Sequence, residues 1–471
     1  MAKRLANIVI LFCILGTGAL TRAQVTLQPG VCPYYKTHPL SLACLIPETT
    51  QAGQSQNLAR FNTTIAQVLG QLPLAAPVSG FVVGFDKSTG QFVPLNENLG
   101  SVLTERGNTV GRHNIFVAFT AQRFVFQTID GNSLSNLKTV GQYATDPTPP
   151  VAGQPAIYEF ESSNNQLSAN LNQYTGIIAV GLTNKIDLSV TVPFERVSLS
   201  GGYSNLTQTY VSYNSAGAAI TGGPVGLLPG QSAQVRVPGS ASGFGDVLVN
   251  MKGTVIDAEK SKVALGAEAR FPTGDEYNLL GTGAYGIKPY IVYSRLGRIT
   301  PHANLGYQWN SFSNLYVNPC YESGTCSPTH PGTGGVPSLK LPPSLDYSAG
   351  VDAGITKWLT VVGDFVGQRY FNSPVVIAAA AAGGTVPFVP NCSVASPPLA
   401  CTAPAVAALS SAGTVGVRTG SISVDNVALG LKIKPIGHLI ISANALIRLD
   451  DGGLRPNRFV PLVGISYSFG K

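Results

Sequence analysis

Apolar and polar residues alternate in long stretches of this chain, most clearly within residues 242–311. In one stretch, an apolar series that runs from Val263 to Phe271 alternates with polar residues such as Lys262 and Glu268. A period of two predicts β-strands with one apolar and one polar face. The stretches are roughly a dozen residues long, whereas soluble strands have about five or six residues and a tilted transmembrane strand needs roughly nine to eleven. The pattern therefore predicts the wall of a transmembrane barrel.

Twelve wall segments are predicted after residue 110, and the connections between them alternate in length. Bacterial barrels have an even number of antiparallel strands, short periplasmic turns and longer outer loops. We therefore expect an all-β, antiparallel up-and-down barrel over residues 111–469, with both ends in the periplasm and fourteen strands if residues 80–95 join the wall. The predicted segments are 112–128, 166–182, 185–198, 243–256, 261–272, 282–295, 298–312, 344–356, 358–371, 421–434, 438–450 and 457–469. The longer connections are 129–165, 199–242, 273–281, 313–343, 372–420 and 451–456, and the tight turns are 183–184, 257–260, 296–297, 357 and 435–437.

The same alternation would also suit a soluble two-layer sandwich with its apolar faces turned inward. The length of the strands and a secretory signal at the N-terminus favour lipid outside and a polar lumen inside. Aromatic residues near the predicted strand ends fit the girdles that flank the apolar band of such barrels. These residues are Tyr285, Tyr293, Tyr307, Trp309, Trp358, Tyr467 and Phe469.

Composition supports export to a membrane. Only 11% of the residues are charged, against about 25% in typical soluble proteins. Residues 1–23 are predicted to be a signal peptide, with Lys3 and Arg4 before an apolar core at 8–15 that is too short to span a bilayer. The formal charge is +7, and removal of Lys3, Arg4 and Arg22 leaves +4. No Lys/Arg-rich run is present, so we expect no nucleic-acid partner.

Four motifs carry a resemblance to a known family. They are Gly245-Asp246-Val247, the run from Ala269 through Arg270-Phe271-Pro272-Thr273-Gly274-Asp275 to Glu276, Leu280-Gly281-Thr282-Gly283, and Pro301-His302-Ala303-Asn304-Leu305-Gly306-Tyr307. Over about residues 80–469 the chain resembles the bacterial outer-membrane family described as the putative MetA pathway of phenol degradation, whose members are often called transporters. The resemblance implies an outer-membrane barrel and, by association, hydrophobic or aromatic substrates.

The last predicted strand resembles the C-terminal signal by which outer-membrane barrels are inserted. Gly464, Tyr467 and Phe469 would be recognised by the barrel-assembly machinery, although Gly470 and Lys471 follow where the aromatic residue usually ends the chain. The other expected partners are the outer-membrane lipids.

Residues 24–110 precede the wall and form the predicted N-terminal segment. Apolar residues at helical spacing predict an amphipathic helix over 55–72, and residues 80–86 and 90–95 fit a hairpin. Two interpretations stay open: a plug inside the barrel, or a periplasmic extension packed on its lower rim. The second is preferred.

Six cysteines remain when Cys13 is removed with the signal. An exported chain meets an oxidising periplasm, so we expect disulfides that staple long outer loops. Fifteen connectivities are possible for six cysteines, and sequence proximity favours three local pairs. The cysteines are Cys32 and Cys44, Cys320 and Cys326, and Cys392 and Cys401.

Charged and polar residues on the polar faces of the strands are the candidate site. Such residues tune which solutes pass through a barrel, although a paired network that only closes a small lumen would use the same residue types. Twelve strands enclose more room than the eight that side chains just fill, and less than open channels of 16 to 18. The predicted lumen-lining residues are Lys185, Asp187, Glu195, Asp246, Lys252, Glu268, Arg270, Lys288, His302, Asp346, Asp352, Asp364 and Arg448.

Enzyme chemistry is not expected. Residues 281–286 match the spacing G-x-G-x-x-G, but a β pattern follows them where a dinucleotide site needs a helix. His302 has no serine at a matching nearby position. No cofactor or metal is predicted, and the acids at 275–276 and 450–451 are taken as solvated loop residues. The sequence predicts a passive channel or transporter for small, hydrophobic or aromatic molecules, with a non-transporting structural or surface-interaction barrel as the alternative.

Overall fold

A computed structural model describes residues 41–43, 45, 83–86, 91–94, 98–146, 156–213, 235–317, 338–378 and 415–469. The predicted signal peptide, the predicted helix over 55–72 and all six remaining cysteines lie outside the described residues. Within the described part of the chain, no helix is both long and apolar enough to cross a membrane.

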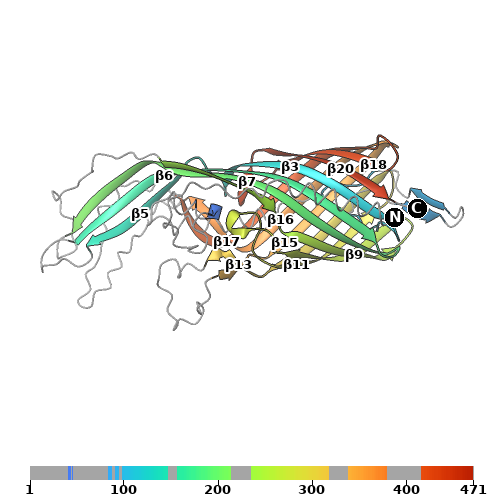
Figure 1. The fold of residues 1–471 in the computed structure, drawn as a ribbon, viewed down its shortest axis with the longest axis horizontal. Coiled ribbons are helices and arrows are strands. Elements are labelled where there is room, and N and C mark those ends of the chain that lie inside the picture. Colours follow the sequence, from blue (N-terminus) through green and yellow to red (C-terminus); the bar gives the residue numbers. More distant parts are fainter. Residues whose placement is uncertain are drawn as a thin grey trace, which may run out of the picture.

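Twelve antiparallel strands form a closed barrel (Figure 1). The ring closes because β3 pairs with β20 on one side and with β6 on the other. In ring order the strands are β3 (Ile115–Ile129), β6 (Ala156–Gly181), β7 (Ile186–Tyr213), β9 (Val247–Asp257), β10 (Ser261–Phe271), β11 (Gly286–Arg295), β12 (Ile299–Asn310), β15 (Ser344–Thr356), β16 (Leu359–Ala378), β17 (Val415–Ile433), β18 (Leu439–Arg448) and β20 (Phe459–Phe469).

The predicted fold is confirmed, and each predicted wall segment overlaps one strand of the ring. Two loops contain more strand than expected, because β6 and β7 continue far beyond the predicted segments and pair with β5 (Leu137–Asp146) and β8 (Val235–Phe244). The extended ends of β6 and β7, together with β5, form the long arm at the left of Figure 1. The sequence of the arm is rich in Ser, Thr, Asn and Gly. A strand outside the membrane has no lipid-facing side, so the apolar alternation that identifies the wall ends before the strand does.

Among the described residues, six further short strands and one 3-10 helix lie outside the ring, and residues 42, 43 and 45 are helical. The predicted hairpin forms as β1 (Val83–Asp86) and β2 (Gln91–Pro94), but these strands make a separate sheet, so the wall has twelve strands and not fourteen. In Figure 1 the hairpin lies at the end of the barrel that holds the tight turns. The remaining elements are β4 (Asn132–Ser133), β13 (Phe312–Val317), β14 (Ser338–Lys340), β19 (Leu454–Pro456) and the helix η1 (Glu276–Asn278).

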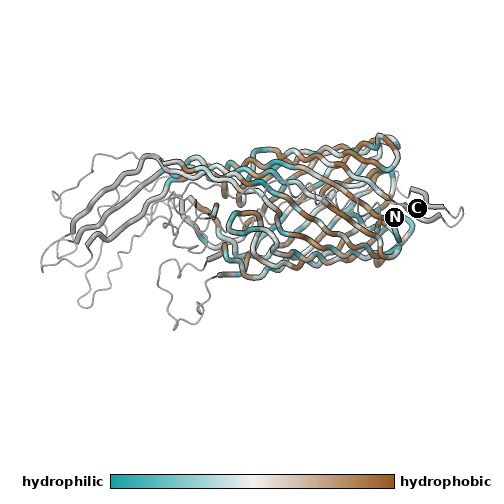
Figure 2. Tube along the Cα trace, in the orientation of Figure 1, coloured by the Kyte–Doolittle hydropathy of each residue, from teal (hydrophilic) through white to brown (hydrophobic). Residues whose placement is uncertain are grey.

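Apolar residues of the wall face outward and polar residues face inward. Along β9, Met251 is 54% exposed and its neighbour Lys252 only 2%, and the same alternation runs along the whole ring (Figure 2). A closed ring with an apolar outer surface satisfies its backbone hydrogen bonds internally, which is what the hydrocarbon core of a bilayer requires. The soluble sandwich is thereby excluded. The chain is a transmembrane β-barrel of the bacterial outer-membrane type.

Candidate functional site in the barrel lumen

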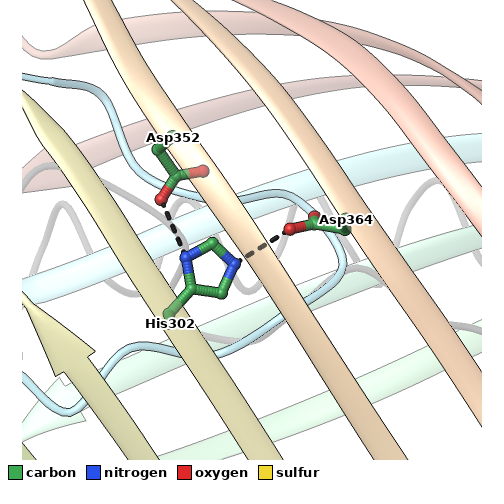
Figure 3. A group of neighbouring side chains, drawn as sticks. All are labelled: His302, Asp352 and Asp364. Atoms are coloured by element: carbon green, nitrogen blue, oxygen red, sulfur yellow. Dashed lines mark hydrogen bonds and ion pairs between the residues drawn. The ribbon is translucent and has the colours of Figure 1, made fainter.

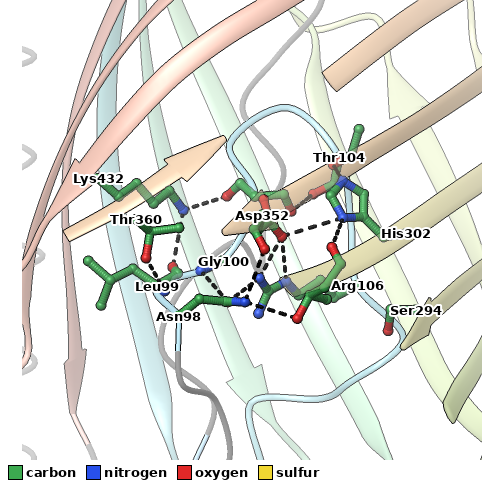
Figure 4. Close-up of polar contacts among 12 residues, drawn as sticks. Asn98, Leu99, Gly100, Thr104, Arg106, Ser294, His302, Asp352, Thr360 and Lys432 are labelled. Carbon is green, nitrogen blue, oxygen red and sulfur yellow. Dashed lines mark hydrogen bonds and ion pairs between the residues drawn. The ribbon is translucent and has the colours of Figure 1, made fainter. Parts of the chain in front are cut away.

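Residues 98–110, called the inner segment below, lie inside the barrel between the tight turns and the middle of the wall. Their backbone is bonded by inward-facing side chains of strands on several sides of the ring (Figure 4). The N–H of Leu99 donates to Thr360 Oγ1 at 2.9 Å and the N–H of Val110 to Asp187 Oδ2 at 2.8 Å. The preferred interpretation, in which this part of the chain packs on the lower rim, is therefore wrong for residues 98–110.

Buried ion pairs fix the inner segment to the wall. Arg106 donates from Nε and Nη2 to Asp352 Oδ2, at 3.1 and 2.5 Å, and both side chains are at most 1% exposed. Lys252 Nζ lies 2.9 Å from Glu105 Oε2 and donates to the carbonyl oxygen of Arg106 at 3.0 Å. Because each charge is taken out of water, the loss of one partner would leave the other buried and uncompensated.

His302 connects the inner segment to two carboxylates of the wall (Figure 3). Its Nε2 lies 2.9 Å from Asp364 Oδ1 and 2.6 Å from Thr104 Oγ1, and its Nδ1 lies 3.4 Å from Asp352 Oδ2. These strands meet because His302 on β12 is paired with Gly350 on β15, and Gly350 is paired with Asp364 on β16. The glycine has no side chain, so the imidazole and the carboxylate approach each other across it.

The contacts of this cluster hold the inner segment to the wall and are not arranged for catalysis. Thr104, His302 and Asp352 place a hydroxyl, an imidazole and a carboxylate in series, as in a nucleophilic triad. However, Asp364 contacts the same imidazole nitrogen and also accepts from Thr104 at 3.2 Å, so that nitrogen is not reserved for the hydroxyl. The side chains of His302, Asp352 and Asp364 offer ligand atoms within 4.8 Å of one another. The guanidinium of Arg106 already supplies positive charge to Asp352, which disfavours a metal cation there.

The structure places twelve of the thirteen predicted lumen residues on the inner face of the wall. Five of them contact the inner segment or the histidine cluster: Asp187, Lys252, His302, Asp352 and Asp364. The exception is Lys185, which lies in the exposed turn before β7 and is not in the lumen. A one-residue difference in where the strand begins is enough to move it out of the barrel.

The other predicted residues lie farther from the tight turns and bond mainly to one another or to neighbouring polar groups. Lys288 Nζ lies 2.9 Å from Glu268 Oε1 and 3.3 Å from Asp346 Oδ2. The remaining contacts join Arg270 to Asn310 at 2.7 Å, Asp246 to the N–H of Thr282 at 2.8 Å, Glu195 to Gln173 at 2.8 Å, and Arg448 to Thr128 at 3.0 Å.

Sequence reasoning missed Lys432 and the inner segment's own charges. Lys432 is 3% exposed on β17 and donates to the carbonyl oxygens of Ser101 and Leu99. Its place between Leu431 and Ile433 in an alternating stretch is a signal that identifies it as inward-facing. Glu105 and Arg106 lie outside any periodic stretch, so no pattern in the sequence pointed to them.

The outer part of the lumen has a different character. Inward residues of seven wall strands, β3, β6, β7, β16, β17, β18 and β20, form one apolar cluster there. The chain contributes a second internal piece to it: Ser41, Leu42, Ala43 and Leu45, called the outer segment below, of which Leu42, Ala43 and Leu45 are fully buried members of the cluster. The N–H of Leu42 donates to Asn278 Oδ1 at 3.3 Å. The wall residues of the cluster include Phe124, Phe126, Leu167, Leu171, Val197, Leu199, Leu446 and Val460.

At the outer rim, acidic side chains bond backbone groups and an arginine. Burial raises the pKa of Asp130, while N–H donors from Val376 and Gly453, both at 2.7 Å, oppose that shift. Asp450 accepts from the N–H of Asp425 at 2.7 Å and lies 3.1 Å from Arg455 Nη2. These contacts tie rim segments together.

The sequence was compared with family models, curated proteins and solved structures. The model of the family described as "Putative MetA-pathway of phenol degradation" matches residues 152–321. The predicted resemblance is confirmed. The matched region is shorter than the predicted 80–469, but it contains Lys252 and His302. No curated protein matched the sequence.

Several solved outer-membrane barrels are similar to this chain. The COG4313 outer membrane channel from Pseudomonas putida F1 is 9% identical, with a TM-score of 0.38 over 77% of this chain and 97% of that one. The Pseudomonas putida toluene transporter TodX is 8% identical, with a TM-score of 0.28 over 76% and 90%. A Pseudomonas aeruginosa FadL homologue is 10% identical, with a TM-score of 0.26 over 76% and 89%.

Proposed function

We propose that this barrel is an outer-membrane channel for the passive passage of small hydrophobic or aromatic molecules, and that the inner segment closes it. The observation that carries the proposal is that the inner part of the lumen is filled by a separate piece of chain and not by the side chains of the wall alone. The inner segment belongs to no strand of the ring, and its bonds to the wall are made by side chains.

A segment held in this way can be released without breaking the barrel. The return of both charges of a buried pair to water recovers their desolvation penalty, whereas removal of one partner leaves an uncompensated charge in the interior. Displacement of the inner segment would expose Asp187, Lys252, His302 and Asp352 to water, and these groups are ionic or strongly polar. The wall would stay intact because its strands are paired to one another around the whole ring.

The apolar cluster in the outer part of the lumen supports hydrophobic or aromatic solutes. Polar side chains alone would line a channel for sugars or ions. Here, inward phenylalanines and leucines continue from the middle of the wall towards the outer rim. The description of the matched family agrees with this substrate class by association.

Insertion by the barrel-assembly machinery through Gly464, Tyr467 and Phe469 belongs to the same proposal. These residues lie on β20, which closes the ring against β3. Tyr467 and Phe469 are 39% and 41% exposed, so both side chains are accessible on the outer face of the closing strand.

Single-channel recording in planar bilayers tests the channel and its gate. Arg106→Ala removes the buried guanidinium and leaves Asp352 without its main partner. The loss should weaken docking of the inner segment in the barrel by about 3–5 kcal/mol. We expect this variant to open far more often than the wild type. Arg112→Ala is the matched control, because Arg112 is exposed at the end of the same stretch. If both variants and the wild type stay closed, the non-transporting barrel becomes the better interpretation. For a variant that opens, uptake of toluene and of phenol into liposomes compares the passage of these two solutes.

A further inference from the structure

The outer segment sits where a hydrophobic solute would bind. Leu42, Ala43 and Leu45 are 0% exposed, and they share one cluster with buried residues of seven wall strands. The neighbouring loop adds Leu279 and Leu280 to the same cluster. The interior at this level therefore accepts branched aliphatic groups, and the chain itself fills it.

The outer segment is not a strand of the ring. The strands that surround it are paired with one another around the ring. The next described part of the chain, the β1–β2 hairpin, lies at the opposite end of the barrel (Figure 1). The outer segment is thus a separate insert in the lumen, and its removal would expose apolar side chains to water unless another apolar group replaced it.

We propose that the apolar cluster in the outer lumen is a binding site for an uncharged aromatic or aliphatic molecule, and that the outer segment is its built-in occupant. A solute of this class displaces Leu42 and Leu45 and takes over their contacts with residues such as Phe124 and Leu171. The exchange of one apolar group for another costs little, whereas a charged or zwitterionic molecule would lose its hydration and gain no partner there. This inference rests on the proposed channel function only for the fate of the solute after binding.

Photolabelling of the purified, folded protein in detergent tests the site. The probe is 3-trifluoromethyl-3-phenyldiazirine, an uncharged aromatic molecule that inserts covalently into the groups it touches on illumination. Labelled residues are mapped by mass spectrometry. The outward residues Leu265 and Leu429, which face the micelle, serve as the internal reference for probe concentration. Photo-leucine, which carries the same reactive group on a zwitterion, is the polar comparison.

We expect inward labelling at Phe124, Leu171 or Leu199 by the aromatic probe and none by photo-leucine. The double variant Leu42→Ala, Leu45→Ala weakens the occupant, so the ratio of inward to outward labelling should rise about tenfold, which corresponds to 1.4 kcal/mol. Leu305→Ala, which removes an equal side chain from the outer face, should leave the ratio unchanged. Heat-modifiable mobility on gels verifies that each barrel is folded.

Absence of inward labelling in both the wild type and the double variant would overturn the site. Equal inward labelling in the two proteins would overturn the role of the outer segment as occupant. Because labelling requires no passage across the membrane, a barrel that is labelled inside but never conducts would support the site and contradict the channel.

Discussion

The inner segment and the outer segment both lie inside the barrel, but the wall meets them with different side chains. Around the inner segment, Asp352, Lys252 and Asp187 supply charges and acceptors that match particular atoms. Around the outer segment, Phe124 and Leu171 supply apolar surface, and the N–H of Leu42 donates to Asn278 Oδ1. The inner segment also packs Val102 and Val110 against apolar wall residues, so the two pieces differ chiefly in the buried ion pairs that hold the inner one.

The difference predicts how the inner and the outer segment respond when a contact with the wall is removed. A buried ion pair has an all-or-none character, because removal of one partner leaves an unpaired charge in a dry interior. Apolar packing loses stability in proportion to the surface and volume removed. A specific perturbation should therefore release the inner segment, whereas the outer segment should yield by degrees to any apolar competitor.

The largest expected effect comes from breaking and then neutralising the Arg106–Asp352 pair. Asp352→Leu or Arg106→Met alone should weaken docking of the inner segment by about 3–5 kcal/mol, since each leaves one buried charge behind. The two substitutions together replace the pair by apolar groups and should restore most of the loss. Hydrogen exchange of backbone amides in residues 98–110, followed by mass spectrometry, measures the docking. Exchange in the double variant as fast as in the singles would show that the ionic pair is not what holds the segment.

Two leucines of the wall allow apolar packing in the lumen to be compared with packing against lipid. Leu171 is fully buried in the apolar cluster, and Leu305 is 49% exposed on the lipid side. Leu171→Ala should lower the free energy of unfolding by about 2–5 kcal/mol because it leaves a cavity. Leu305→Ala should cost clearly less. Urea unfolding in lipid vesicles, followed by tryptophan fluorescence of Trp309 and Trp358, gives both values, and equal losses would contradict the placement of the cluster inside the barrel.

The wall was predictable because one physical rule governs every position in it. A strand between lipid and lumen must alternate, so the parity of Met251 and Lys252 was enough to assign their faces. The same rule identified His302, Asp352 and Asp364 as inward-facing. It did not reveal that they form a cluster, because their proximity depends on the register between β12, β15 and β16.

The contents of the lumen were not predictable in the same way. Residues 98–110 have no alternation, and their partners come from strands that only closure of the ring brings around them. Glu105 and Arg106 looked like ordinary loop charges, and only their buried partners give them a role. Leu42 and Leu45 gave no periodic signal either, and they are assigned to the lumen only by their membership of the apolar cluster.

The smallest expected effect concerns Gly350, which lets the histidine cluster form. A Cβ added there would overlap the carboxylate of Asp364 and lie 2.6 Å from His302 Nε2 and 2.9 Å from the carbonyl oxygen of Gly363. Gly350→Ala should therefore separate His302 from Asp364 and disturb Thr104, at a cost of about 1–3 kcal/mol typical of overpacking. Gly363→Ala on the neighbouring strand is the matched control, because its Cβ would meet nothing closer than Leu429 Cδ2 at 3.8 Å.

Hydrogen exchange of the backbone amides in residues 98–110 also measures the effect of Gly350→Ala and Gly363→Ala. Gly350→Ala should speed exchange at the amides around Thr104 more than at those around Val110, because Val110 is held by Asp187 on the other side of the ring. Gly363→Ala should match the wild type at both places. Uniform acceleration along residues 98–110 in Gly350→Ala would mean that the inner segment is released as one unit, and that the histidine cluster controls the whole of it and not only its nearest residues.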